Sequence, residues 1–140
     1  MHKTNIINLE NILIFSSLCF ITNIITTFIN KDYIYCFLFI LLVITSLIYH
    51  SNSNIYTYTF DRIVIIFVIL YGAYNLYNKS DSNKNIYVII VVILFLVILI
   101  LYYYRYYMNQ FCFHKNICIA NKYHSLLHLL SSVGHHLIII

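Results

Sequence analysis

Charged residues are scarce in this sequence, and Asp, Glu, Lys and Arg together account for only 9% of its 140 residues. Hydrophobic residues account for 62%, and the mean hydropathy is +0.85. A soluble domain carries roughly 25% charged residues, and a chain this short cannot enclose so many apolar side chains in a core. The composition therefore excludes a soluble domain and a disordered tail, and it predicts an integral membrane protein.

Proline and tryptophan are absent, and the only glycines are Gly72 and Gly134. Without proline, long uninterrupted helices are permitted, and tight turns must be built mainly from Asn and Ser. The net charge of +4 is small and scattered, so the sequence does not indicate a nucleic-acid partner. The abundant Ile, Asn, Tyr, Phe and Lys have AT-rich codons, which suggests the GC-poor genome of a protist or large DNA virus.

Five apolar runs are separated by charged residues and Asn clusters. Runs of this length reach about 26–33 Å as helices, which matches the roughly 30 Å core of a bilayer. The alternation typical of barrel strands is absent. The sequence therefore predicts an all-α, multi-pass transmembrane bundle that forms a single membrane domain over residues 1–140. Its helices are predicted at 11–29, 33–50, 61–77, 86–107 and 119–140.

The distribution of Lys and Arg predicts the orientation of these helices. Five basic residues fall on the side of the N-terminus and three on the opposite side, which favours a cytoplasmic N-terminus. The first group is Lys3, Arg62, Arg105, Lys115 and Lys122, and the second is Lys31, Lys79 and Lys84.

Five polar residues lie at the ends of, or inside, these apolar runs. Ser46 and His50 are four residues apart at the end of the second run, and Asp61 opens the third. His124 and His128 are again four residues apart in the fifth run. Residues at this spacing share one helix face. Five crossings also place all three segments on the same side of the membrane, so the five side chains are expected to meet at one depth.

This set of side chains suits a metal site. Three neutral imidazoles form an open tetrahedral zinc site, with water as the fourth ligand, so His50, His124 and His128 are the predicted zinc ligands. Asp61 is predicted to orient that water and move its proton, and Ser46 to donate a supporting hydrogen bond. Taken singly, these residues also have structural interpretations: an interfacial His50, an Asp61 that caps its helix, and a Ser46 bonded to its own helix.

The fifth run carries further polar residues beyond this set. His135 lies near the same face as His128 but about 10 Å further along the helix axis, so it cannot share a metal ion with His124. We interpret His135, Ser131 and Ser132 as a polar lining that faces the bundle, and His136 as pointing elsewhere.

These residues resemble the CREST superfamily of membrane hydrolases, which includes alkaline ceramidases, progestin/adipoQ receptors and myomaker-like proteins. The family pattern is Ser-x-x-x-His ending the second helix, Asp opening the third, and His-x-x-x-His in the last. Here it reads Ser46-Leu-Ile-Tyr-His50, Asp61 and His124-Ser-Leu-Leu-His128. The resemblance implies zinc held by the three histidines, with Asp61 and Ser46 beside it, and hydrolysis of an amide in a lipid such as ceramide.

The sequence also departs from that family. CREST proteins have seven helices, whereas five are predicted here, so this chain is a shortened form that lacks two. Removing two helices preserves the side of the membrane on which each site residue lies. The acidic cluster that binds calcium in ceramidases is not matched, since only Glu10 lies near its place.

Three functions follow from these patterns. The first is a zinc-dependent lipid amide hydrolase that acts on membrane lipids. The second is a non-enzymatic receptor-like or membrane-remodelling protein that keeps zinc for structure. The third is a metal-free structural multi-pass protein that forms homo-oligomers.

Overall fold

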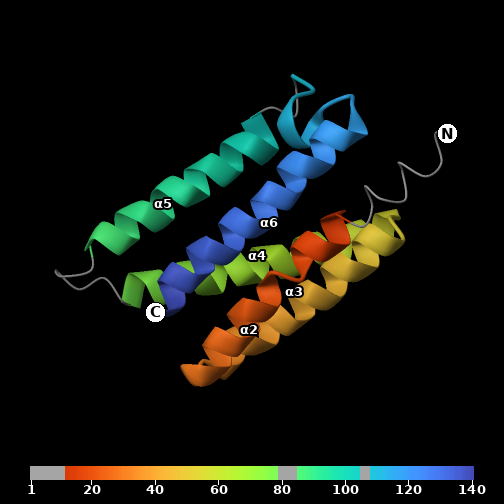
Figure 1. The fold of residues 1–140 in the computed structure, drawn as a ribbon. Coiled ribbons are helices and arrows are strands. Elements are labelled where there is room, and N and C mark those ends of the chain that lie inside the picture. Colours follow the sequence, from red (N-terminus) through yellow and green to blue (C-terminus); the bar gives the residue numbers. More distant parts are fainter. Residues whose placement is uncertain (1–11, 79–84, 105–107) are drawn as a thin grey trace.

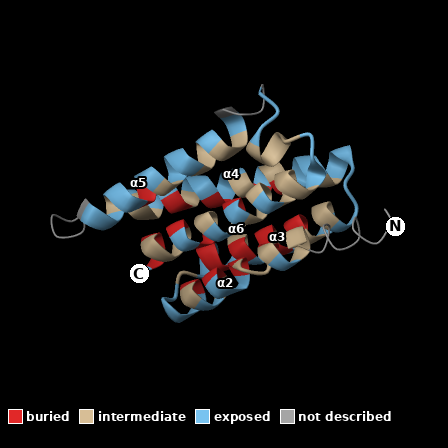
Figure 2. Cartoon of the chain, turned by 45° about the horizontal axis from the view of Figure 1, so that its top comes forward, coloured by how far each residue is buried: buried red, intermediate tan, exposed pale blue. Residues whose placement is uncertain are grey.

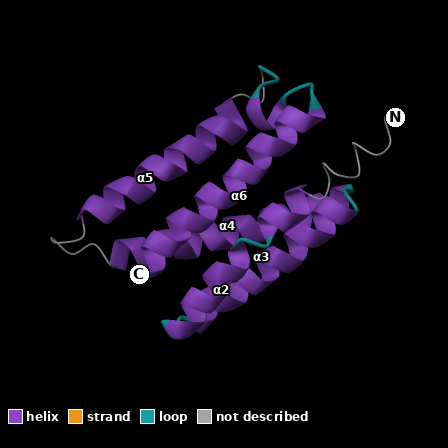
Figure 3. Cartoon of the chain, in the orientation of Figure 1, coloured by secondary structure: helices purple, strands orange, loops and turns teal. Residues whose placement is uncertain are grey.

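The computed structural model describes residues 12–78, 85–104 and 108–140, and within them it consists of helices joined by short turns, with no strand (Figures 1 and 3). This confirms the all-α prediction. Lys3, Glu10, Lys79, Lys84 and Arg105, which entered the sequence predictions, lie outside these residues. The elements in chain order are α2 (Phe20–Ile29), α3 (Tyr33–Ser51), α4 (Ile55–Asn78), α5 (Asn85–Leu99), the π-helix η2 (Ile100–Tyr104), the 3-10 helix η3 (Phe111–Phe113) and α6 (Ile117–Ile139).

Within the described residues, four helical segments are long and apolar enough to cross a membrane. Figure 2 shows that many of their residues are exposed. Many of these residues are large and hydrophobic, as expected where lipid replaces water as the solvent. The fifth helix, α6, has 23 residues but falls below the other four in hydropathy. Its crossing of the membrane therefore stays a prediction. The four spans are Ile12–Ile29, Tyr33–Ser51, Ile55–Asn78 and Ile86–Tyr103.

The start of α4 corrects one prediction. The segment 51–60 was expected to be a loop, with Asp61 opening the third helix, but α4 already begins at Ile55. The Asn54 side chain caps it by accepting hydrogen bonds from the backbone N–H groups of Tyr56 and Thr57 at 2.9 and 3.0 Å. Asp61 is therefore the seventh residue of the helix and is only 3% exposed, so it caps nothing.

A break interrupts the first span at residues 18–19, just before α2 begins. The hydroxyls of Ser16 and Ser17 donate hydrogen bonds to the carbonyls of Leu13 and Ile14, three residues earlier, at 3.0 and 2.7 Å. Such side-chain bonds compete with the helical ladder and bend helices. The break leaves the Ser16 hydroxyl facing α6, where it meets His128.

The helices pack as two groups joined along α6. The most extensive contacts are between α3 and α4 and between α2 and α3, while α5 packs mainly on α6 (Figure 1). Tyr35 and Phe39 of α3 are completely buried and form the centre of the core. Because α6 contacts α2, α4 and α5, its polar face is turned into the bundle.

Hydrogen bonds made by side chains hold α6 against α2. Asn23 donates to the Ser132 carbonyl at 3.0 Å, and the Ser132 hydroxyl donates to the Asn23 Oδ1 at 2.6 Å. Thr22 and His136 are also hydrogen-bonded, at 2.8 Å. Polar residues commonly join membrane helices in this way, since lipid offers them no partner.

The two glycines provide a matched test of this packing. A Cβ on Gly72 would lie 2.6 Å from the hydroxyl oxygen of Tyr35, which is wholly buried and hydrogen-bonded to His135, whereas a Cβ on Gly134 would meet only Leu94, at 3.9 Å. We expect Gly72→Ala to lower the free energy of unfolding by about 1–3 kcal/mol, because the ring cannot retreat. Gly134→Ala should leave it unchanged or raise it by up to about 1 kcal/mol. Unfolding of both variants in detergent measures this, and equal stabilities would contradict the packing described.

Candidate metal centre

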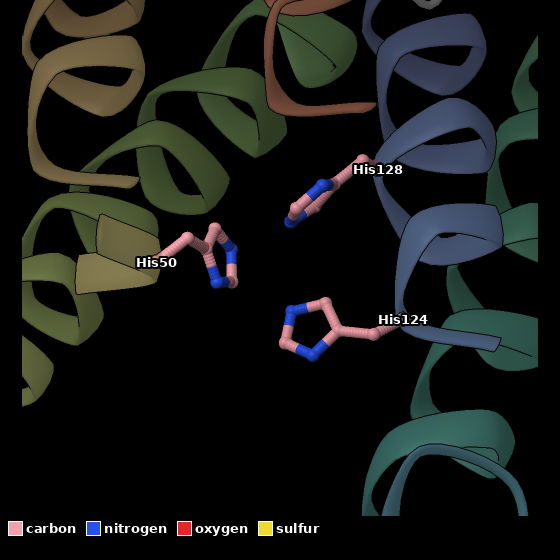
Figure 4. A group of neighbouring side chains, drawn as sticks. All are labelled: His50, His124 and His128. Atoms are coloured by element: carbon pink, nitrogen blue, oxygen red, sulfur yellow. The ribbon is translucent and has the colours of Figure 1, made fainter. Parts of the chain in front are cut away.

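Three histidines from two helices point toward one another (Figure 4). His50 lies in the last turn of α3, and His124 and His128 lie four residues apart on one face of α6. Their ring centroids are 5.0 Å apart for His124 and His128, 5.2 Å for His50 and His124, and 5.4 Å for His50 and His128. The structure therefore brings together the three residues that the sequence predicts as ligands.

The spacing of the ring nitrogens suits a small cation. One nitrogen from each of His50, His124 and His128 lies within 4.8 Å of the other two. A tetrahedral zinc ion binds nitrogen at about 2.0–2.1 Å, which places its ligand atoms about 3.3 Å apart. Small rotations of the imidazoles would close the difference. Three protonated rings at this separation would repel one another strongly, so the arrangement favours neutral rings that offer lone pairs.

A hydrogen bond orients one of the three rings. The Ser16 Oγ lies 2.8 Å from Nδ1 of His128 and also donates its proton to the Leu13 carbonyl. Because a carbonyl oxygen only accepts, the single hydroxyl proton belongs to that bond, and Ser16 accepts from Nδ1–H of His128. This fixes the tautomer that leaves Nε2 of His128 free to bind a metal ion.

The other predicted site residues line a cavity next to the histidines. Ser46, Asp61, His124 and His128 all border this cavity of about 460 Å³. Its size lies within the range of roughly 300–1,000 Å³ found for small-molecule sites. Ser46 and Asp61 are each 3% exposed. The polar end of the cavity thus contains a carboxylate, a hydroxyl and two imidazoles.

The Asp61 carboxylate is held by two neighbours. The Thr45 hydroxyl shares its proton between the Leu42 carbonyl at 3.2 Å and the Asp61 Oδ1 at 3.4 Å, and the Arg62 Nη2 lies 3.8 Å from the Asp61 Oδ2. The first contact weakly fixes the plane of the carboxyl group, and the second places a positive charge beside it. Asp61 is therefore positioned as a buried proton acceptor rather than as a helix cap.

Sequence reasoning missed the roles of Ser16 and Arg62. Ser16 was treated only as part of an apolar run, and Arg62 was used only to count charges. Both carry a signal: a Ser-Ser pair inside a membrane helix bends it, and an arginine among apolar residues is costly unless it is paired. Neither signal identifies the partner residue, which becomes apparent only from the tertiary contacts.

The remaining polar residues of α6 lie toward its C-terminal half. His135 is hydrogen-bonded to the Tyr35 hydroxyl, and Ser131 and His135 border the same cavity. His136 instead turns to Thr22. Among the described residues, the only cluster with metal-ligand spacing contains His50, His124 and His128.

Comparisons with known proteins add no further assignment. The sequence matches no family model, no curated protein and no solved structure. The resemblance to CREST proteins therefore rests on the motif residues themselves.

Proposed function

We propose that this chain is a shortened CREST-type membrane protein that binds one zinc ion through His50, His124 and His128 and hydrolyses an amide bond in a lipid. The observation that carries the proposal is the convergence of three ring nitrogens within 4.8 Å, on helices that are far apart in the sequence. Imidazoles inside a membrane segment are costly unless they are paired or functional. A metal ion would satisfy all three at once.

The cavity supports a lipid as the substrate. Its polar end holds Ser46 and Asp61, and its remaining walls are largely aliphatic and aromatic side chains of α4 and α5. Since α5 packs mainly on α6, the space between α4 and α5 is the natural route by which a lipid would enter from the bilayer. The side chains that border this route include Ile63, Ile66, Ile69, Phe95 and Ile98.

The reaction would be divided among the residues at the polar end. A bound zinc ion would lower the pKa of a water molecule and would polarise the carbonyl group of the substrate. The Asp61 carboxylate accepts the proton of the attacking water, whose oxygen bonds to the carbonyl carbon, and then delivers that proton to the leaving nitrogen as the C–N bond breaks. The Ser46 hydroxyl, which borders the same cavity, donates a hydrogen bond to the carbonyl oxygen as charge develops there.

The hydrolase part of the proposal is tested by incubating the intact protein with labelled N-acylated sphingoid bases, in detergent and in vesicles, and measuring their turnover. Release of the free fatty acid and the free amine in equal amounts is the expected result. Zinc binding without turnover of any such substrate would replace the hydrolase with the non-enzymatic zinc protein. Absence of zinc from the purified protein would exclude both the zinc hydrolase and the non-enzymatic zinc protein, and would favour a structural membrane protein without a metal.

The hydrogen bond from His128 to Ser16 gives a second test. We expect Ser16→Ala to weaken zinc binding by about 10–100-fold, because loss of the acceptor frees the ring and its tautomer. Ser17→Ala is the matched control, since the described bond of its hydroxyl goes to Ile14 of its own helix. Competition with a chelator of known affinity measures both. Equal zinc affinities in the two variants would show that Ser16 does not position His128.

A further inference from the structure

Arg62, which borders the larger cavity beside Asp61, has a buried N–H group that lacks a hydrogen-bond partner among the described residues. That group is Nε–H, which is buried although the side chain as a whole is 21% exposed. The nearest carboxylate oxygen, that of Asp61, lies 3.8 Å from Nη2, which is too far for a hydrogen bond. A guanidinium has five N–H donors in a planar fork, and within the described part of the chain none of them is used in a hydrogen bond.

Aromatic rings hold the Arg62 guanidinium in place. Its carbon lies 5.0 Å from the ring centroids of both Tyr58 and Tyr102 and 5.9 Å from that of Tyr49. These cation–π contacts stabilise the charge and restrict the side chain, but they leave the in-plane N–H groups free. Tyr102 belongs to the π-helical segment η2, a distortion often found at functional sites.

A second cavity, of about 410 Å³, adjoins the first at this point. Four tyrosines, Arg62 and His124 form most of its wall, and Arg62 and His124 also border the larger cavity. The four tyrosines are Tyr49, Tyr58, Tyr102 and Tyr103. Guanidinium and phenol groups are hydrogen-bond donors to anions. One hydroxyl proton is used in the hydrogen bond between Tyr58 and Tyr102, and the remaining phenols and the Arg62 guanidinium present donors to the smaller cavity.

The charges around the smaller cavity favour an anion. Among the described residues, no Asp or Glu lines it, and Asp61 borders only the larger one. Burial raises the pKa of the Cys112 thiol in its wall to about 12, so this thiol is neutral at physiological pH. Arg62 thus has the Asp61 carboxylate on one side. On its other side lies a polar cavity whose described lining has no negative charge to balance the guanidinium.

From this arrangement we infer that the smaller cavity binds the anionic group of an amphiphilic lipid, a carboxylate or a phosphate, on the fork of Arg62, with the apolar chain lying in the larger cavity. A planar fork binds both oxyanions through paired hydrogen bonds. The two cavities meet at Arg62, so a single ligand would place its charge beside the tyrosines and its tail between α4 and α5. The inference holds whether or not the three histidines bind a metal ion.

The test compares charged lipids with uncharged partners of the same chain. The purified protein in neutral detergent is mixed with one of two equimolar lipid pairs, either palmitate with methyl palmitate or phosphatidate with diacylglycerol. Native mass spectrometry then measures which lipid of the pair the protein retains. We expect a preference of about tenfold or more for the charged member of at least one pair, the magnitude typical of hydrogen bonds to a charged group. A preference in the first pair alone identifies a carboxylate ligand, and in the second alone a phosphate ligand.

Variants assign that preference to Arg62. Arg62→Gln should abolish it, and Arg62→Lys should reduce it, because lysine keeps the charge but lacks the fork. Lys122→Gln removes an exposed cation that lines neither cavity and should leave the preference unchanged. Thermal unfolding and retention of the uncharged lipid show that each variant is folded. The inference is overturned if the unmodified protein retains both members of each pair equally, or if Arg62→Gln keeps the preference.

Discussion

Replacing His128 by alanine is expected to remove zinc from the protein, from one ion per chain to essentially none. His128 is the central ligand of the proposed site, since it shares a helix face with His124, faces His50 across the bundle and is fixed by Ser16. Two imidazoles in a membrane protein without a third ligand do not make a structural or catalytic zinc site. Elemental analysis of detergent-purified protein, after exchange into metal-free buffer, measures the loss.

His136→Ala provides the matched control, because it removes an imidazole from the same helix without touching the cluster. His136 is hydrogen-bonded to Thr22 of α2, about two turns of α6 beyond His128. Its zinc content should equal that of the unmodified protein. Unchanged zinc in His128→Ala, with the helical signal preserved in both variants, would refute the proposed ligand set.

Asp61→Asn is expected to lower the rate of lipid amide hydrolysis by about 10²–10⁴-fold, the usual contribution of a general acid–base. Asparagine keeps the shape of the side chain and can still contact Thr45, but it cannot carry the proton from water to the leaving nitrogen. Zinc content should not change, because Asp61 is not one of the three proposed ligands. The initial rate of fatty acid release under saturating substrate measures the effect.

Asp32→Asn is the corresponding control at the opposite end of α3. Asp32 caps that helix and accepts hydrogen bonds from Tyr71 and Asn75, at 2.9 and 2.7 Å. Loss of its charge should affect stability without a comparable effect on the chemical step. Full activity in Asp61→Asn, or an equal loss of activity in both variants, would remove Asp61 from the proposed mechanism.

The helices themselves follow closely from the apolar runs. The second was predicted at 33–50 and is observed at Tyr33–Ser51, because Asp32 marks its start both by charge and as a capping residue. The third begins six residues earlier than predicted. Hydropathy locates the part of a helix that suits lipid, whereas Asn54 and the Tyr- and Thr-rich turn after it allow the helix to continue outside that part.

The proximity of the histidines could be predicted, but the groups that support them could not. Spacing of four residues and the parity of the crossings are properties of the sequence, and they bring His50 toward His124 and His128. The contact of Ser16 with His128 depends on a local break in the first span. The three tyrosines around Arg62 come from α3, α4 and η2, so only the packing of these elements reveals them.

The central claim is that the three histidines form a zinc site, and X-ray absorption at the zinc edge of the purified protein tests it most directly. The account predicts one zinc ion per chain with three imidazole nitrogens at about 2.0–2.1 Å and a light-atom fourth ligand. Protein that binds no zinc, or zinc with sulfur ligands at about 2.3 Å, would contradict it.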